Sequence, residues 1–243
     1  MKWGNDLLDL AEQLQDAHGI AAGWPLFRSA LGRFGVTDVG YAFSWRQAGG
    51  ADDIVMHYDY PQAFLDRYDE AGHVNNDWAL KHCLSEPERV ALTTERATAN
   101  LSSAEMQLEH ECLDFGLEHF AMIPLRDGRM GKGGISAAFR GISEAEFRRL
   151  AAAHVDDLRG IGLIFHSAMR SQPGLGGLVE LSPREREVLT WTAAGRSSKV
   201  IAHRLNLSTR TVEHHIASAA KRLGAHNRTH AVAKALVLNL IRP

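Results

Sequence analysis

Four chain-breaking residues, one proline and three glycines, stand among the seven residues from Ser171 to Gly177. Helical patterns of apolar residues precede and follow this stretch, but no periodicity runs through it, which is typical of a linker. The 243 residues also exceed the usual size of one domain. We therefore expect a first domain over residues 1–170, a linker over 171–177 and a second domain over 178–243.

The two expected domains carry opposite charge. Residues 178–243 hold 11 Lys and Arg against 4 Asp and Glu, whereas residues 1–177 hold 16 against 25. A compact basic domain is the electrostatic footprint of a protein that binds nucleic-acid phosphates, because each neutralised phosphate releases counterions. On charge alone, a solvated basic surface is an equally good interpretation.

Composition and targeting signals narrow the class of protein. Apolar residues make up 45% and charged residues 23%, an ordinary globular balance. Asp6, Asp9, Glu12 and Asp16 interrupt the first 18 residues, where a signal peptide needs an apolar segment, and no run of 18 apolar residues follows. We therefore expect a soluble, cytoplasmic protein without a membrane partner. Cys83 and Cys112 lack any disulfide or metal-ligand pattern, so we expect both to be buried as small hydrophobic residues.

The first domain is predicted to combine helices with an antiparallel sheet, an α+β fold. Apolar residues at helical spacing predict helices over residues 5–18, 25–35, 61–70, 78–84, 104–115 and, after a capping box at Ser143 and Glu146, up to about Met169. Alternating patterns predict strands over residues 39–45, 54–58, 120–125 and 134–139, paired through glycine-containing turns at 49–50 and 128–134. Local pairing with helices on either side favours an α-β-α sandwich.

The second domain is predicted to be all-α, with four helices. Ser182, Pro183 and Glu185 supply the cap, first-turn proline and capping-box acid of a helix that Gly195 ends. Further helices are predicted over residues 199–205, 209–223 and 228–240. The second and third are joined by a three-residue turn and form a helix-turn-helix. The last helix offers an apolar face formed by Ala231, Val232, Ala235, Leu236 and Leu238.

The helix over 209–223 has two distinct sides. At 100° per residue, the core stripe consists of Val212, Ile216, Ala219 and Leu223. The opposite side presents Arg210, His214, Ala217 and Lys221, with Glu213 at its edge. Arginine, glutamate and lysine there could meet a guanine, a cytosine amino group and a phosphate. An ordinary helical hairpin with a solvated face remains the alternative.

Specific residues of the second domain match a known family. They include the run Leu181-Ser-Pro-Arg-Glu-Arg-Glu-Val-Leu189, Gly195-Arg-Ser-Ser198, Thr211-Val212 and Lys221-Arg-Leu223. Over the last 63 residues the chain resembles the DNA-binding domain of LuxR-type regulators, and Glu185, Leu189 and Gly195 match three hallmark positions. The resemblance implies that residues 209–223 form the recognition helix and that the last helix helps to form a dimer on two-fold symmetric DNA. The implied DNA-binding residues are Ser198, Lys199, Thr209, Arg210, Thr211, Glu213, His214, Ala217 and Lys221.

The first domain starts with helices and a hairpin, which disfavours the alternating β/α pattern of a phosphate-accepting receiver domain. Its residues 34–43, Tyr60-Pro61, Asp77 and Ile123-Pro124 are similar to the acyl-homoserine-lactone-binding domain of quorum-sensing LuxR-type receptors, over roughly residues 3–169. The resemblance implies a small, mostly apolar signal. The implied ligand-binding residues are Tyr60, Phe64, Tyr68, Asp77, Trp78, Phe120 and Ser136.

The implied pocket departs from the family pattern. Phe64 replaces the tryptophan that holds the polar head of the signal, so one hydrogen bond worth about 0.5 to 1.5 kcal/mol is lost. The other replacements are Trp78 for a proline, Leu92 for a second tryptophan and Phe120 for a glycine. Of six hallmark positions only Tyr68 and Asp77 match, which indicates a re-specified ligand. From chemistry alone, Asp77 is either a ligand acceptor or a surface acid.

Catalytic and metal-binding motifs are weak in this sequence. His110-Glu111-Cys112 lacks the HExxH spacing, and the glycine-rich segment 128–134 lacks the P-loop spacing. We expect no catalytic residue, no metal and no cofactor. The sequence therefore predicts a ligand-responsive, homodimeric transcription regulator that binds double-stranded DNA and senses an acyl-homoserine lactone or a related non-lactone molecule. The alternative is an orphan LuxR-type regulator that needs no ligand and is controlled by a protein partner.

Overall fold

The computed structural model describes residues 3–44, 54–85, 90–93, 101–126, 132–173 and 179–243. The chain divides into two compact units, of which the first runs up to Ala17 and from Ala21 to Ser167, and the second comprises His18–Ile20 and Ala168–Pro243. The predicted turn at 49–50 lies outside the described residues, as do Trp45, residues 128–131 of the predicted turn at 128–134, and residues 174–177 of the predicted linker. No helix within the described ranges is long and apolar enough to span a membrane.

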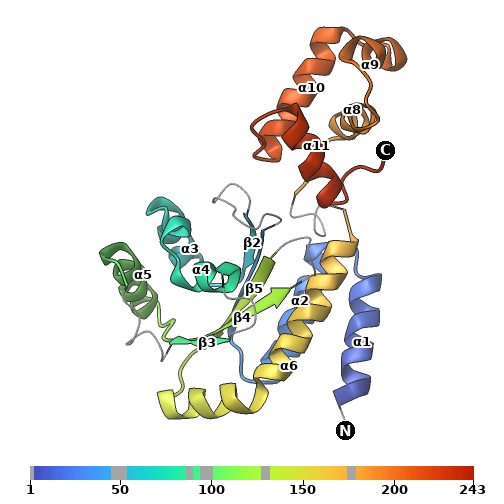
Figure 1. Cartoon of the computed structure of the whole chain (residues 1–243). Coiled ribbons are helices and arrows are strands. Elements are labelled where there is room, and N and C mark those ends of the chain that lie inside the picture. Colours follow the sequence, from blue (N-terminus) through green and yellow to red (C-terminus); the bar gives the residue numbers. More distant parts are fainter. Residues whose placement is uncertain (1–2, 45–53, 86–89, 94–100, 127–131, 174–178) are drawn as a thin grey trace. The chain divides into compact units, whose positions relative to one another are not determined.

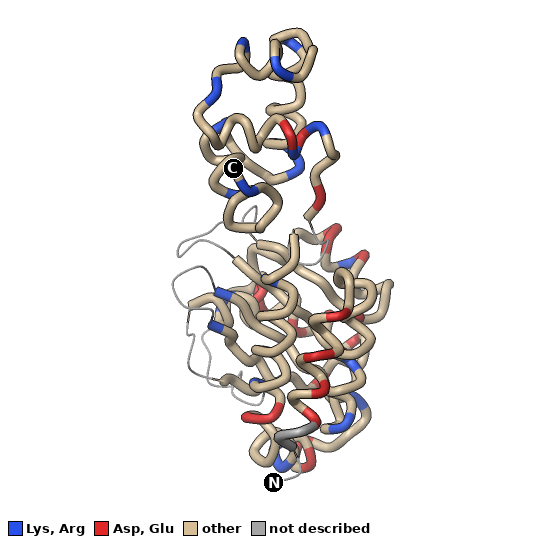
Figure 2. Tube along the Cα trace, turned by 90° about the vertical axis from the view of Figure 1, so that its right-hand side faces the viewer, with Lys and Arg blue, Asp and Glu red and all other residues tan. Residues whose placement is uncertain are grey.

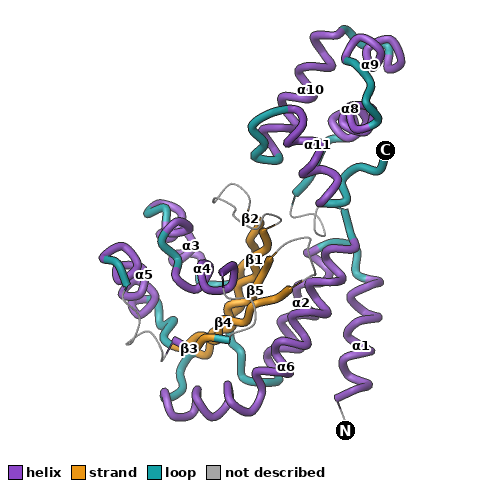
Figure 3. Tube along the Cα trace, in the orientation of Figure 1, coloured by secondary structure: helices purple, strands orange, loops and turns teal. Residues whose placement is uncertain are grey.

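An antiparallel sheet forms the centre of the first unit (Figures 1 and 3). Its strands are β1 (Asp38–Ser44), β2 (Ile54–Tyr58), β3 (Ala91–Leu92), β4 (His119–Arg126) and β5 (Lys132–Phe139). They lie in the order β2-β1-β5-β4-β3. The predicted hairpins are therefore present, and the central pair joins β1 to β5, with Asp38 opposite Ala138.

Helices cover both faces of this sheet (Figure 1). One layer contains α1 (Trp3–Asp16), α2 (Ile20–Gly32) and α6 (Glu144–Ser171). The other contains α3 (Gln62–Glu70), the short 3-10 helix η2 (His73–Asn75), α4 (Trp78–Ser85) and α5 (Ser103–Asp114). This arrangement confirms the predicted α+β class and the α-β-α sandwich.

The predicted start of the second helix is wrong. α2 begins at Ile20, five residues before Pro25, and continues through the proline. Proline removes the hydrogen bond to the carbonyl four residues earlier. Trp24, Phe27 and Leu31 of the same helix are buried, and burying a large apolar side chain contributes about 1.5 to 3 kcal/mol. Tertiary packing therefore outweighs the missing bond.

Aromatic packing joins the layer of α2 and α6 to the sheet. The rings of Phe27 and Phe165 are stacked with centroids 4.1 Å apart. Tyr41 of β1 packs edge-on against Phe165, and its hydroxyl lies 2.8 Å from Nδ1 of His166. All four side chains are buried. These rings thus form a closed core on this face of the sheet, whereas the opposite face borders a cavity.

Gly134 of β5 allows α4 to approach that opposite face closely. A Cβ at this position would lie 2.5 Å from Cβ of Cys83 and 2.6 Å from its Sγ. Such distances are shorter than any ordinary van der Waals contact. Because Cys83 is itself buried in α4, a side chain at Gly134 would push the helix away from the sheet.

The second unit is helical, with α8 (Pro183–Ala193), α9 (Ser198–Leu205), α10 (Thr209–Arg222) and α11 (Arg228–Val237). The predicted caps are confirmed, since Ser182 and Glu185 form a capping box and Ser208 and Asn227 cap α10 and α11. The predicted core stripe of Val212, Ile216, Ala219 and Leu223 is buried.

The last helix, α11, is shorter than predicted and uses most of its apolar face internally. It ends at Val237 instead of Leu240, and Asn239 beyond it has a positive φ of 54°. Ala231, Ala235 and Leu238 are buried in the same unit, whereas Leu236 is 41% exposed. The apolar surface left over for a partner is therefore smaller than the sequence pattern indicates.

Replacing Gly134 tests the close approach of α4. We expect Gly134→Ala to lower the free energy of unfolding by about 1 to 3 kcal/mol, because the added methyl group overpacks the contact with Cys83. Gly160→Ala in α6 is the matched control, since a Cβ there meets nothing within 4 Å and alanine favours a helix. Urea unfolding of both variants measures the difference. Equal stability of the two would contradict this account.

Candidate functional sites

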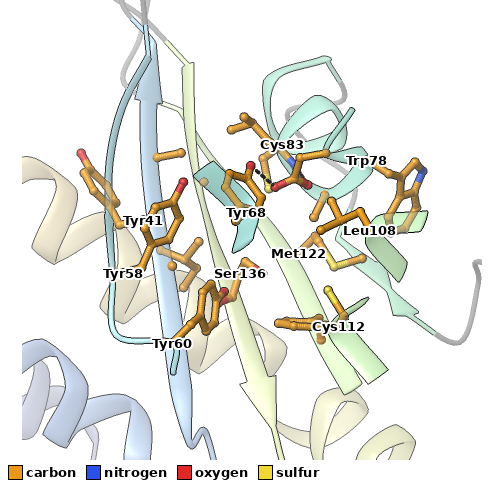
Figure 4. Close-up of a pocket in the computed structure, with 18 of the residues that line it drawn as sticks. Tyr41, Tyr58, Tyr60, Tyr68, Trp78, Cys83, Leu108, Cys112, Met122 and Ser136 are labelled. Atoms are coloured by element: carbon orange, nitrogen blue, oxygen red, sulfur yellow. Dashed lines mark hydrogen bonds between the residues drawn. The ribbon is translucent and has the colours of Figure 1, made fainter. Parts of the chain in front are cut away.

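All seven residues predicted to bind a ligand line one cavity between the sheet and α3, α4 and α5 (Figure 4). Its volume is about 80 Å³. Most of its lining is apolar or aromatic, contributed by Phe64, Leu65, Trp78, Leu80, Leu108, Phe120, Met122 and Ile135 among others. The predicted residues come from α3, α4, β4, β5 and the segments just before α3 and α4, so the fold brings them together from distant parts of the sequence.

The carboxylate of Asp77 lines this cavity and accepts hydrogen bonds from two neighbouring groups. Its Oδ2 accepts a hydrogen bond of 2.9 Å from the Tyr68 hydroxyl (dashed line in Figure 4), and its Oδ1 accepts one of 2.9 Å from the Leu80 amide. The second bond caps the N-terminus of α4. Burial raises the pKa of Asp77, and the hydrogen bonds from Leu80 and Tyr68 act against that rise. An ionised carboxylate has about four acceptor positions, so capacity remains for a further donor.

Tyr60 and Ser136 also meet in the cavity. The Tyr60 hydroxyl donates a hydrogen bond of 2.9 Å to the carbonyl oxygen of Ser136. Gly40 of β1 makes room for this side chain, because a Cβ there would lie 2.9 Å from the Tyr60 hydroxyl oxygen. The hydroxyl of Tyr60 is therefore already engaged, and a ligand would have to share it or displace the bond.

Aromatic rings form the rest of the predicted site. Phe64 and Phe120 are buried, and each packs edge-on against the ring of Tyr60, with centroids 5.9 and 6.0 Å apart. Trp78 is half-buried at the start of α4. Because Phe64 presents only carbon and hydrogen, this wall of the cavity offers no donor from position 64.

Sequence reasoning missed several lining residues. Tyr58 is the clearest case, since its ring stacks on Tyr60 and its hydroxyl donates a hydrogen bond to Sδ of Met56. Tyr58 lies opposite Gly40 in the register of β1 and β2, so only a known register could have placed it here. Cys83 and Cys112 also line the cavity and are buried as predicted. Burial raises the pKa of the Cys83 thiol.

Ion pairs connect α5, which lines the cavity, to the neighbouring helices. Glu111 accepts hydrogen bonds from Arg67 at 2.9 Å, and its other oxygen lies 2.8 Å from Nε2 of His73. Burial opposes ionisation of Glu111, but these partners outweigh it and lower its pKa to about 2. At the other end of the helix, Lys81 donates to Glu105 at 2.8 Å. These contacts join α5 to α3, η2 and α4.

The charge asymmetry expected from the sequence is visible in Figure 2, where Lys and Arg are scattered over the helices of the second unit. The predicted outward side of α10 is exposed at Arg210, His214, Ala217 and Lys221. Lys199 and Thr209 are exposed as well, and Thr211 is half-buried with its hydroxyl 2.8 Å from that of Ser208. This side of α10 can meet a DNA groove.

Two of the predicted DNA-binding residues are engaged within the protein. Ser198 is buried, unlike the other members of the set. Its hydroxyl donates a hydrogen bond to Glu213, and it accepts one of 2.9 Å from Arg228. Both side chains are therefore hydrogen-bonded within the second unit, and Glu213 stays exposed on α10 beside the basic side chains.

Glu185, a hallmark position of the sequence, is a buried carboxylate that joins α8 to α10. It accepts hydrogen bonds from Ser218 at 2.6 Å and from Arg222 at 3.2 Å. Burial opposes its ionisation, but the bonds from Ser218 and Ser182 outweigh this and hold its pKa below the ordinary value. Within the described residues, no group of three or more His, Cys, Asp or Glu could hold a metal ion.

Comparisons with known proteins identify a family for each of the two domains. Residues 20–169 match the family described as autoinducer binding domain, and residues 179–235 match bacterial regulatory proteins of the luxR family. The chain is 24% identical over 246 residues to the transcriptional activator protein BjaR1 of Bradyrhizobium diazoefficiens, covering 99% of this chain and 98% of that protein. It is 29% identical over 245 residues to the quorum-sensing regulator RhlR of Pseudomonas aeruginosa, covering 98% and 96%.

Solved structures show the same fold. A crystal structure of Escherichia coli SdiA matches with a TM-score of 0.52 at 17% identity, covering 98% of this chain and 99% of that one. The N-acylhomoserine-lactone-dependent factor CepR2 of Burkholderia cenocepacia matches with a TM-score of 0.51 at 20% identity, covering 67% and 92%. Because the two family matches account for most of the chain, the protein is not an enzyme and belongs to the LuxR family of ligand-responsive quorum-sensing transcription regulators, with an autoinducer-binding domain and a helix-turn-helix DNA-binding domain.

Proposed function

We propose that the cavity of the first unit binds a compact, mostly apolar signal that donates one hydrogen bond to Asp77. The observation that carries this proposal is that one cavity is lined by Tyr60, Phe64, Tyr68, Asp77, Trp78, Phe120 and Ser136. An apolar enclosure with a few polar groups is the usual form of a small-molecule site. Asp77 supplies an acceptor, and an N–H or O–H group of the signal would use the capacity that Tyr68 and Leu80 leave free.

The size and polarity of the cavity restrict the signal further. Its volume of about 80 Å³ is well below the roughly 300 to 1,000 Å³ of pockets for drug-sized ligands. We therefore propose a short or compact apolar part, unless the helices move outward to admit a longer one. Since Phe64 cannot donate, a carbonyl on the head of the signal would receive no hydrogen bond from this position. The candidates are an acyl-homoserine lactone and a related molecule with a less polar head.

Two substitutions test the ligand site by thermal melting with short- and long-chain acyl-homoserine lactones. Asp77→Asn should reduce the ligand-dependent rise in Tm, because it weakens a buried contact worth about 1 to 3 kcal/mol. Phe64→Trp should preserve or strengthen the response if the signal is a lactone. If the head of the signal is not a lactone, it should clash with the larger indole ring of Phe64→Trp, at a cost of about 1 to 3 kcal/mol. Asp114→Asn, which changes an exposed carboxylate of α5, is the control.

The absence of a melting shift in both the unsubstituted chain and Phe64→Trp would reject the lactone. A second candidate function would then gain weight: an orphan regulator that folds without ligand and responds to a protein partner. One observation favours it. Tyr60 donates a hydrogen bond to the Ser136 carbonyl and Tyr68 donates one to Asp77, so both hydroxyl groups already have partners within the protein. A small molecule bound to the purified protein would separate the two candidates.

For the second unit, we propose that α10 enters the major groove of a two-fold symmetric operator, bound by a homodimer in the cytoplasm. The residues proposed to face DNA are Lys199, Thr209, Arg210, Thr211, His214, Ala217 and Lys221. A recognition helix that follows a three-residue turn reads bases near its N-terminus, and two half-sites about one helical turn apart require two copies of the domain. The exposed basic side of α10 supports this orientation.

Substitutions on α10 distinguish base reading from phosphate contact. Lys221→Gln should weaken binding to every DNA sequence by a similar factor. It should also reduce the slope of log affinity against log salt concentration by about one, as expected for the loss of one phosphate contact. Arg210→Gln, near the start of α10, should change the base preference at one position. Binding to a randomised duplex library at two salt concentrations measures both effects. Equal losses on all sequences for both variants would refute groove reading by α10.

Leu236 tests the proposed dimer, because it is the large apolar side chain of α11 that remains exposed among the described residues. Leu236→Asp should lower the mass in solution from dimer to monomer and reduce operator affinity, since a carboxylate cannot be buried unpaired in an apolar contact. Analytical ultracentrifugation gives the mass. Thr229→Asp, at an exposed position earlier in α11, controls for added charge. If Leu236→Asp leaves mass and affinity unchanged, α11 does not form the interface.

A further inference from the structure

Arg228, the first residue of α11, contacts the three other helices of the second unit. Its Nη1 donates a hydrogen bond of 2.9 Å to the Ser198 hydroxyl of α9. Its Nη2 donates to the Arg196 carbonyl at 3.0 Å and to the Thr192 hydroxyl of α8 at 3.3 Å. Nη1 also lies 3.9 Å from Oε1 of Glu213 in α10. One guanidinium therefore links α8, the turn after it, α9 and α10.

The hydroxyl groups in this network can point in one direction only. Ser198 has a single hydrogen, which it donates to Glu213, so it must accept from Arg228. Thr192 donates its hydrogen to the Val188 carbonyl at 2.8 Å and likewise accepts from Arg228. A planar guanidinium with several fixed donors suits these separate acceptors, whereas a lysine ammonium on a flexible stem does not.

This network sets the orientation of the Glu213 carboxylate and places a positive charge beside it. Glu213 stands in α10 beside His214 and one turn after Arg210, on the helix that presents the exposed basic side chains. A free carboxylate there would repel DNA phosphates. Instead one of its oxygens accepts from Ser198, and the positive charge of Arg228 lies next to it. Since Glu213 is 56% exposed, this ion pair contributes little to stability and mainly fixes orientation.

We propose that Arg228 is a positioning residue for DNA recognition. It holds α10 against α9 and keeps the Glu213 carboxylate turned toward the protein, so that Arg210, His214 and Lys221 face the DNA without a competing negative charge. Ser198 and Glu213 are partners of Arg228 in this role and do not contact bases. Selectivity for DNA sequence then depends on a residue that does not touch DNA.

The test uses the full-length chain and a duplex selected by that chain from a random library. Arg228→Gln should lower affinity by about tenfold, the scale of one hydrogen bond to a charged group, with a smaller loss for Arg228→Lys. Glu213→Gln alone should lower affinity less than Arg228→Gln does, because the amide oxygen can still accept from Ser198 and no negative charge is left beside the DNA. Added to Arg228→Gln, it should recover about threefold of the loss, because the released carboxylate is removed. Arg186→Gln, an exposed arginine of α8, controls for lost charge.

The readouts separate positioning from a purely structural role. Recovery of affinity by Glu213→Gln in the Arg228→Gln background, without recovery of Tm, supports positioning. If Glu213→Gln alone changes which base is preferred, Glu213 reads DNA and the proposal is overturned. It is also overturned if Arg228→Lys and Arg228→Gln both retain affinity within about twofold, or if affinity in all variants simply follows Tm. Should Arg228→Gln fail to fold, the same double-substitution comparison is made with Arg228→Lys.

Discussion

The Asp77 carboxylate joins the two helices on which the ligand side of the first unit is built. It caps α4 through the Leu80 amide and accepts the Tyr68 hydroxyl of α3. Burial alone would favour the neutral acid, so the anion depends on these donors. The same group lines the cavity. A donor on the signal would therefore strengthen the interaction that orders α3 and α4, which gives a physical route from ligand binding to stability of the domain.

The cavity exists because its neighbours are held at fixed distances. Gly134 lets α4 lie close to the sheet, Gly40 makes room for the ring of Tyr60, and Glu111 joins α5 to α3 and η2. The DNA-binding domain uses the same device, a carboxylate whose partners come from other helices. Glu185 connects α8 to α10, and Arg228 connects α11 to the other three. In both domains, a carboxylate with hydrogen-bond partners on other helices helps to set the geometry of the functional face.

The sequence predicted those features whose signals are local. The capping box of Ser182 and Glu185 and the stripe from Val212 to Leu223 need only neighbouring residues, and both are present. The predicted start of α2 at Pro25 was wrong, because the burial of Trp24 and Phe27 outweighs the hydrogen bond that the proline removes. The pairing of β1 with β5 has no local signal, and Tyr58 could not be placed in the cavity without the β1–β2 register. The burial of Ser198 depends on how α11 packs, which no pattern within α9 reveals.

The most direct measurement is mass spectrometry of whatever small molecule the purified, DNA-binding protein carries after expression with and without candidate signals. The account predicts one compact, mostly apolar molecule with an N–H or O–H donor, released in a one-to-one ratio on denaturation and depleted in Asp77→Asn. Protein that is folded and binds DNA with the same affinity while carrying no small molecule under any condition would contradict it.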